Sequence, residues 1–503
     1  MKPEELKSFL DKKKLHFILA ADAEPRIHQK RNEDGSENIF IPAGGVSVAL
    51  DPIAQVANAV FIGRGRTKED KEVVSRGNKV EIKGDLGNYY LKRVFVSEKE
   101  RADYYDGYSN QTLWPLCHIA YERPVFERKW FANYQKVNQY FAKAINEEIK
   151  PNSFIWVHDY QLSLVPSMLK KPKGVTIGMF WHIPWPTWEI FRILPQKIEI
   201  LESLLSCDFL AFHRGYQVRN FLDTVRRELE VRIDEETNRI YYKKRVTTVK
   251  NLPMGIDVDV IKGLLEDAPA ETVITSIVNT FIGKKDKSSK KNILDEFFKK
   301  NNVIVGIDRL DYTKGLTSRL VAIDKFFEKN PQYIGKAVYV GIIAPSREAI
   351  PSYQKLKAEI KNLIREINLK YARNNWLPIH LIYHTFSRED VIKFYQKSKI
   401  CLVTPLDDGM NLVSKEFVIA SSKEKEPGML VLSQFAGSAI DLTDALIVNP
   451  YDIDEVADAI KTGLVMSKEE KVRRIRSMAE ELENKNIYVW TQEFVKSALE
   501  ATR

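Results

Sequence analysis

The sequence predicts an α/β protein with two doubly wound domains that face one another across a cleft. The first observation is its length of 503 residues, which exceeds the size of a single hydrophobic core. The second is an alternation of short β-rich runs and helical stretches in both halves of the chain. This alternation is typical of parallel sheets whose two faces are covered by helices.

Each domain has its own series of predicted strands. The N-terminal series lies at residues 16–21, 153–158, 176–182 and 209–213. The C-terminal series lies at residues 302–307, 337–343, 379–384, 400–404, 429–433 and 445–448. Residues 315–331 and 388–398 are predicted helices between strands of the second series. Ligands of open α/β sheets bind beyond the carboxyl ends of the strands, so we expect the site there.

The domain boundary is predicted within residues 246–261, where strand, proline and glycine signals separate the two series. We therefore assign residues 1–248 to the first domain and residues 249–480 to the second. Residues 481–503 are predicted to form a helix that returns to the first domain. A helical segment before the first strand is expected to have a packing role, and the lysine-rich stretch 283–292 is expected to be an exposed loop.

Net charge, apolar runs and cysteine spacing limit the partners and the location that we expect for this protein. The net charge is +9, but the lysines are scattered, so no nucleic-acid partner is expected. No apolar run reaches the roughly 18 residues that cross a bilayer, so no membrane partner is expected. The charged start has no apolar leader core, and a cytoplasmic location is therefore expected. The three cysteines, Cys117, Cys207 and Cys401, are far apart and are expected to be buried thiols.

A basic loop follows the first strand of the C-terminal series. The stretch RLDYTKG places Arg309 and Lys314 five residues apart, before a helix. An arginine fork, a lysine point charge and a helix N-terminus together suit a diphosphate. From this stretch alone, the alternative is an exposed basic loop.

An acidic loop, PLDDGMNLVSKEF, follows the strand at 400–404. Gly409 relaxes its backbone, and the peptide N–H groups of NLVS begin a helix where phosphate oxygens can bind. Asp408 and Glu416 are eight residues apart, so they suit two separate hydroxyl-bearing groups better than one catalytic dyad. A sugar and a ribose with phosphates between them would fit. The alternative is a turn aspartate and a solvated glutamate.

Two strands of the N-terminal series end in polar residues. Asp159 follows the strand at 153–158, and His182 ends the strand at 176–182. A histidine before Ile-Pro is often a satisfied structural residue, whereas an aspartate after a buried strand is more suggestive of a site. Neither residue shows metal-ligand spacing.

Taken together, these stretches resemble the trehalose-6-phosphate synthase family, retaining glycosyltransferases of the GT-B fold. The resemblance extends from about residue 42 to residue 494. Its marks occur in family order: YSNQTLWP, HDYQLSLVP, HIPWPTWEIFRILP, CDFLAFH, PMGID, RLDYTKG, IAPSRE, PLDDGMNLVSKEF, SQFAGSA and LIVNPYD. It implies two Rossmann-like domains, the first binding an acceptor and the second a nucleotide sugar.

On the donor side, the resemblance implies a site for a nucleoside-diphosphate glucose. Arg309 and Lys314 would bind the diphosphate, assisted by the backbone N–H groups of Leu412 and Val413. Glu416 would hold the ribose hydroxyls.

The transferred glucose has implied contacts of its own. Asp408 would hydrogen-bond this sugar, and His182 would bond its 6-hydroxyl. Gly44 and Gly45 would let the backbone approach the donor.

On the acceptor side, the implied partner is glucose 6-phosphate. Asp159 would meet the acceptor sugar, and Tyr105, Trp114 and Arg347 would surround its phosphate. The implied reaction keeps the anomeric configuration and needs neither a metal nor another cofactor. Its catalytic residues would be Asp159, His182, Arg309, Lys314 and Asp408. A homo-oligomer is expected by family analogy alone.

The sequence departs from the family pattern at the acceptor phosphate. Ala23 stands where the family carries an arginine after the first strand, and Arg26 is a possible substitute. Arg64 and Arg66 stand where the family more often has tryptophan, glycine and serine. Either other arginines rebuild the phosphate site, or the acceptor is another phosphorylated sugar or polyol. A non-catalytic ligand-binding homologue is the third hypothesis, which the full set of predicted donor residues disfavours.

Overall fold

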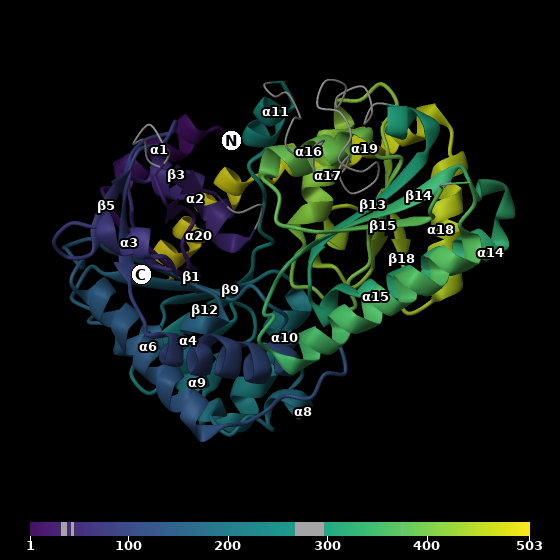
Figure 1. The fold of residues 1–503 in the computed structure, drawn as a ribbon. Helices are drawn as coiled ribbons and strands as arrows, with labels where there is room; N and C mark the ends of the chain where they lie inside the picture. Colours follow the sequence, from purple (N-terminus) through teal and green to yellow (C-terminus); the bar gives the residue numbers. More distant parts are fainter. Residues whose placement is uncertain (32–37, 42–44, 267–295, 375, 503) are drawn as a thin grey trace. The chain divides into compact units, whose positions relative to one another are not determined.

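The computed structural model describes residues 1–31, 38–41, 45–266, 296–374 and 376–502. Its internal contacts divide the chain into two units. Among the described residues, the first comprises 1–31, 38–41, 45–255 and 486–502, and the second comprises 256–266, 296–374 and 376–485. Figure 1 draws both units and labels some of their helices and strands.

Within the described residues, the first unit is built on a ten-stranded sheet in the order β10-β11-β12-β9-β8-β7-β1-β4-β6-β5. The strands from β12 to β6 pair in parallel, and β10, β11 and β5 add antiparallel pairs. The strands are β1 (His16–Ala23), β4 (Val60–Arg64), β5 (Lys79–Ile82), β6 (Tyr89–Val94), β7 (Ser153–His158), β8 (Thr176–Phe180), β9 (Phe209–Phe212), β10 (Arg232–Asp234), β11 (Arg239–Tyr242) and β12 (Arg245–Asn251). A separate hairpin joins β2 (Ile27–Gln29) and β3 (Asn38–Phe40).

Helices pack against this sheet. They are α1 (Pro3–Lys13), α2 (Val46–Val56), α3 (Lys68–Glu72), α4 (Glu98–Arg101), α5 (Trp114–Cys117), α6 (Arg128–Asn146), α7 (Val165–Met168), α8 (Trp188–Phe191), α9 (Lys197–Leu204), α10 (Gly215–Glu228) and α20 (Ile487–Ala501). A π-helix, η1 (Ala102–Leu113), joins α4 to α5. Leu6 and Leu10 of α1 are buried in the same core as Trp490 and Phe494 of α20, so α1 has the packing role expected for it.

The second unit is an all-parallel sheet in the order β15-β14-β13-β16-β17-β18. Its strands are β13 (Asn302–Arg309), β14 (Ala337–Ala344), β15 (Ile379–Tyr383), β16 (Ile400–Val403), β17 (Met429–Ser433) and β18 (Leu446–Val448). Its helices include α11 (Val258–Glu266), α14 (Leu316–Lys329), α15 (Pro351–Tyr371), α16 (Arg388–Lys397), α17 (Leu412–Ser422), α18 (Ile453–Val465) and α19 (Lys468–Asn484). Figure 1 shows α14, α15 and α18 on one face of this sheet and α16, α17 and α19 on the other.

The predicted strands of both series are present, but the sequence analysis did not predict β2 to β6, β10 or β11. Of these, β4 and β6 carry buried cations, because Arg64 ends β4 and Lys92 and Arg93 lie inside β6. Arg64 of β4 pairs with Asp22, and Arg93 of β6 pairs with Glu24. Because a charge inside a strand looks like a solvated residue until its partner is known, apolar runs alone did not reveal these two strands.

The predicted boundaries fall inside regular elements. The break predicted between residues 248 and 249 lies within β12, which pairs with β9, and the units divide after Gly255. The break predicted after residue 480 lies within α19, and the segment that belongs to the first unit begins at Asn486. The predicted loop 283–292 lies outside the described residues. In the described part of the chain, no helix is long and apolar enough to cross a membrane. The three cysteines are buried and free, as predicted.

A buried arginine joins the strands of the second unit. Arg319 of α14 is 1% exposed, and its Nη1 lies 2.7 Å from Oδ2 of Asp308 in β13. Its Nε donates to the Thr404 hydroxyl after β16 at 3.0 Å, and its Nη2 donates to the Lys314 carbonyl at 3.2 Å. One side chain therefore fixes the ends of two neighbouring strands and the loop between β13 and α14.

The variant Arg319→Met is expected to lower the free energy of unfolding of the second unit by about 3–5 kcal/mol, because it leaves the Asp308 carboxylate buried without its cation. Adding Asp308→Asn to this variant is expected to recover part of the loss, since no uncompensated charge is left. Urea unfolding measures both, with Arg365→Met, at an exposed arginine of α15, as the control. Equal costs for Arg319→Met and Arg365→Met would contradict the inferred role of the buried pair.

Candidate active site

The loop after β13 carries the two predicted diphosphate ligands. Arg309 is the last residue of β13 and its side chain is exposed, while Lys314 ends a short 3₁₀ turn and is largely buried. Gly315 follows with φ of 63°. A Cβ at Gly315 would lie 2.3 Å from the Thr404 carbonyl oxygen, so the turn requires glycine to approach the loop after β16.

Lys314, in the loop after β13, forms a salt bridge with Asp408, in the loop after β16. The Lys314 Nζ donates to Asp408 Oδ2 at 2.5 Å, and the Asn411 amide donates to the same oxygen at 3.1 Å. The loop after β17 supports this arrangement, since the Gly437 N–H donates to the Asp408 carbonyl at 3.0 Å. A Cβ at Gly437 would lie 2.0 Å from the Gly409 carbonyl oxygen, which explains the glycine in SQFAGSA.

The N-terminus of α17 begins directly after this acidic loop. Asn411 has φ of 90°, and its side-chain oxygen caps the helix by accepting from the Ser414 N–H at 3.0 Å. Leu412 and Val413 are the first two residues of α17, where backbone N–H groups have no partner within a helix. This geometry supplies the donors and the favourable dipole that phosphate oxygens need.

Glu416 lies in the second turn of α17 and is 6% exposed. Arg388, the first residue of α16, donates to Glu416 Oε1 through Nε at 3.1 Å, and its Nη2 lies 2.9 Å from the same oxygen. The salt bridge holds the carboxylate in one orientation, as a residue that selects a ribose would require.

Arg347 is held within the second unit. Its Nη1 donates to Asp311 Oδ2 at 3.0 Å and to the Tyr353 hydroxyl at 2.5 Å. Burial raises the pKa of Asp311, but the charges of Arg347, Arg309 and Lys314 and a hydrogen bond from the Thr313 N–H together keep it below its ordinary value. Arg347 belongs to a different unit from Tyr105 and Trp114. Its predicted contact with the acceptor phosphate stays a prediction.

In the first unit, Asp159 and His182 follow the neighbouring parallel strands β7 and β8. Asp159 has φ of 71°, a conformation that costs energy for a residue with a side chain. Its Oδ1 accepts from the His182 N–H at 3.0 Å, and its own N–H donates to the Phe180 carbonyl at 2.8 Å. The carboxylate thus fixes the backbone of His182, and the structure brings these two predicted residues together.

His182 is the middle member of a chain of three histidines. The Met254 N–H lies 3.4 Å from His213 Nδ1, which places the His213 proton on Nε2. His213 Nε2 then donates to His182 Nδ1 at 3.3 Å, and His182 Nε2 donates to His158 Nδ1 at 3.0 Å. Burial lowers the pKa of His182 to about 3, so its ring is neutral.

Both ring nitrogens of His182 are therefore used by other histidines. Its predicted bond to a sugar 6-hydroxyl requires one of these hydrogen bonds to be exchanged for the sugar. The sequence analysis missed His158 and His213 as hydrogen-bond partners of His182. Both histidines were in quoted stretches, His158 in VHDYQL and His213 in CDFLAFH. Only the side-by-side order of β7, β8 and β9 makes the three rings neighbours.

Tyr105 and Trp114, which were predicted to surround the acceptor phosphate, lie on and directly after the π-helix η1. The Tyr105 ring packs under the guanidinium of Arg64 at 5.2 Å, and Trp114 packs on His118 with ring centroids 4.1 Å apart. Gly45 has φ of 102° just before α2, which favours glycine there. Gly44 lies outside the described residues.

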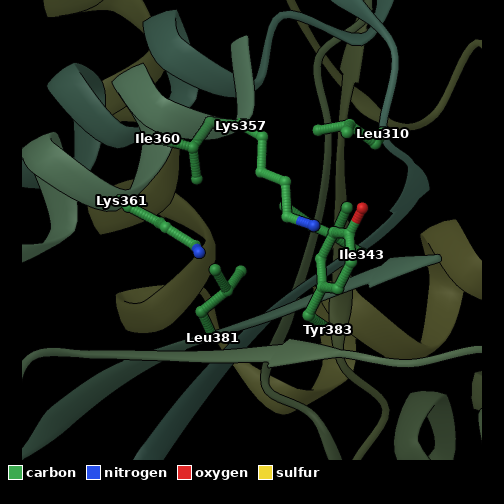
Figure 2. A pocket seen from close by; sticks show the side chains of 7 residues that line it. All are labelled: Leu310, Ile343, Lys357, Ile360, Lys361, Leu381 and Tyr383. Carbon is green, nitrogen blue, oxygen red and sulfur yellow. The ribbon is translucent and has the colours of Figure 1, made fainter. Parts of the chain in front are cut away.

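A cavity of about 150 Å³ lies in the second unit, beside α15 and the ends of β14 and β15. Figure 2 shows the side chains that line it. Its lining residues are Leu310, Ile343, Lys357, Ile360, Lys361, Leu381 and Tyr383. None of the predicted site residues lines this cavity. Among the described residues, no group of three His, Cys, Asp or Glu side chains is arranged to hold a metal ion.

Comparison with known proteins shows which family the chain resembles. The family model of glycosyltransferase family 20 matches residues 14–500. The chain is 38% identical over 410 residues to the UDP-forming α,α-trehalose-phosphate synthase of Pichia angusta, a match that covers 80% of this chain and 82% of that protein.

Two solved structures are similar over nearly the whole chain. An E. coli structure with UDP-2-fluoro glucose bound has a TM-score of 0.80 and 30% identity, covering 96% of this chain and 98% of that chain. A UDP-forming α,α-trehalose-phosphate synthase from Burkholderia xenovorans, in complex with glucose-6-phosphate, has a TM-score of 0.81 and 28% identity. That match covers 96% of this chain and 100% of that chain.

The expected GT-B fold class, with two Rossmann-like units, is confirmed by this likeness. The matched range includes both the loop with Arg309 and Lys314 and the loop with Asp408. This chain belongs to glycosyltransferase family 20.

Proposed function

We propose that this chain is a retaining glucosyltransferase that moves glucose from a nucleoside-diphosphate glucose to glucose 6-phosphate and so makes α,α-trehalose 6-phosphate. UDP-glucose is the proposed donor, because the Pichia angusta relative is UDP-forming and the E. coli neighbour holds UDP-2-fluoro glucose. Glucose 6-phosphate is the proposed acceptor, because the Burkholderia xenovorans neighbour was solved with it.

The observation that carries this proposal is the Lys314–Asp408 pair beside the N-terminus of α17. A sugar diphosphate has phosphate oxygens that a cation and helix N–H groups can bind, and sugar hydroxyls that a carboxylate can bind. This pair and the start of α17 supply all three kinds of group. In the proposed complex, Lys314 exchanges Asp408 for phosphate oxygens, and Asp408 accepts from a glucose hydroxyl. Glu416, oriented by Arg388, accepts from the ribose.

In the proposed reaction, the bond between the glucose anomeric carbon and the diphosphate oxygen breaks first. Its electron pair goes to the leaving diphosphate, and positive charge develops on the glucose ring. The acceptor hydroxyl attacks the same face, and its proton passes to the departing phosphate. Arg309 and Lys314 stabilise the charge that grows on the leaving group, so no metal ion is assigned to this step.

A different acceptor is the second candidate, and Ala23 is the observation that favours it. Alanine cannot make the phosphate contact that the family arginine makes. A polyol phosphate or another sugar phosphate would use the same donor chemistry.

The proposed reaction is tested by incubating the protein with UDP-, GDP- or ADP-glucose, each with and without glucose 6-phosphate. Nucleoside diphosphate release is expected to depend on glucose 6-phosphate and to be greatest with UDP-glucose. The product is identified by its mass and by the configuration of its anomeric protons. Release that never depends on glucose 6-phosphate contradicts the proposed acceptor, and release restored by another sugar or polyol phosphate supports the second candidate.

Arg309→Ala is expected to lower kcat by about a hundredfold or more, because it removes a cation from the charge that develops in the transition state. Steady-state rates at saturating substrates measure this effect. Arg365→Ala, at an exposed arginine of the same unit, is the matched control and should keep normal turnover. Near-normal turnover in Arg309→Ala would remove this residue from the mechanism.

Glu416→Gln is expected to raise the KM for the nucleotide sugar by about tenfold with a smaller change in kcat, because a ribose contact is made equally in the ground and transition states. Glu424→Gln, just past the end of α17, is the control. A large fall in kcat at unchanged KM would assign Glu416 to the chemical step instead.

A further inference from the structure

We propose that Arg66 binds the phosphate group of the acceptor sugar in place of the arginine that is missing at position 23, with Arg64 fixed beside it. This inference rests on the proposed glucosyltransferase function. It names the residue through which this chain would select a phosphorylated acceptor over a neutral one.

The strand register places a cation next to the missing one. Ala23 is the last residue of β1, Arg64 is the last residue of β4, and the two are direct partners in the parallel pair β1–β4. Neighbouring strands lie about 4.8 Å apart. The family position that lost its arginine therefore has an arginine beside it, on the adjacent strand.

Arg64 is committed to a carboxylate. Its Nε and Nη2 donate to the two oxygens of Asp22 at 2.9 and 3.0 Å, and the Tyr104 hydroxyl donates to Asp22 Oδ1 at 3.0 Å. Asp22 and Arg64 are both buried and their charges cancel. The pair can orient the site and support the Tyr105 ring, but it offers a phosphate no net positive charge.

Arg66 supplies that charge. Its side chain is exposed, and its guanidinium has no hydrogen-bond or ion-pair partner in the described part of the chain. Burial raises the pKa of Asp22, and the charges of Arg64 and Arg66 contribute to a final value below the ordinary one, so Arg66 lies within electrostatic reach of this pair.

The backbone that carries Arg66 is held in place although its side chain is not. The N–H groups of Arg66 and Thr67 donate to Oδ2 of Asp70 at 2.9 and 3.0 Å. Asp70 is fully buried, and Arg93 lies 2.9 Å from its other oxygen. A fixed loop with an unengaged guanidinium is what a phosphate-binding residue requires, because little ordering is left to be done on binding.

Arg26, the substitute suggested by the sequence, is less suited to this role. Its Nε and Nη2 donate to the two oxygens of Asp51 at 3.1 and 2.9 Å. The Tyr89 hydroxyl also donates to Asp51, at 2.6 Å. The planar fork of Arg26 is therefore already used, and phosphate binding there would break a salt bridge that Arg66 does not have.

The test compares the full-length wild type with Arg66→Ala, Arg66→Lys and Arg76→Ala. Arg76 is another exposed arginine of the first unit and serves as the matched control. Calorimetry measures the binding of glucose 6-phosphate and of glucose without any donor. Arg66→Ala is expected to weaken glucose 6-phosphate binding by about tenfold or more, since a charged hydrogen-bond partner is lost, and to leave the glucose signal unchanged. Arg66→Lys keeps the charge but loses the planar guanidinium, so its affinity for glucose 6-phosphate is expected to lie between those of the wild type and Arg66→Ala.

Kinetics on the same variants separate this inference from the proposed function. If the wild type turns over with glucose 6-phosphate, Arg66→Ala should raise the KM for glucose 6-phosphate and leave the KM for the nucleotide sugar unchanged. Binding that is lost in Arg66→Ala while the wild type shows no turnover would support the role of Arg66 and contradict the proposed reaction. Unchanged binding in Arg66→Ala, an equal loss in Arg76→Ala, or no binding of glucose 6-phosphate by the wild type would overturn the assignment.

Discussion

Buried charges must be paired, and this constraint organises the ends of the strands in both units. In the second unit, Arg319 and Asp308 pair below the surface and connect β13, the loop before α14 and the end of β16. In the first unit, Arg93 pairs with Glu24 and Asp70 and connects β6 to the residue after β1 and to α3, whose Asp70 holds the loop after β4. Each network fixes the loops that carry the proposed ligand-binding residues.

The two proposed substrates meet different kinds of chemistry in these loops. On the donor side, the proposed residues are already paired with opposite charges: Lys314 with Asp408, and Glu416 with Arg388. Donor binding would replace a salt bridge by contacts to phosphate and sugar, so neither of these two pairs leaves a charge uncompensated in the unliganded protein. Such exchange also explains why the site can be strongly charged without destabilising the unit around it.

The first unit shows the opposite solution next to Asp159. Three histidines lie close together, and burial keeps the pKa values of His158 and His182 low, so these rings stay neutral. Their hydrogen bonds run in one direction from the Met254 N–H, which fixes the tautomer of each ring. A neutral, ordered group of this kind suits a sugar hydroxyl that replaces one of its hydrogen bonds, whereas the cationic loop with Arg66 suits a phosphate.

The sequence by itself determined the fold class and the two loops at Arg309 and Asp408. It also determined the six strands of the second sheet and, in the first sheet, β1, β7, β8 and β9. Apolar runs, glycines and helix starts are local signals, and they do not depend on which segments become neighbours. The strands β4 and β6, the histidine chain and the pairing of Ala23 with Arg64 were decided by tertiary structure alone. The physical reason is that a buried charge or imidazole is stabilised by its partner, and that partner lies tens of residues away, as Asp22 does from Arg64. Only the order and register of the strands bring such partners together.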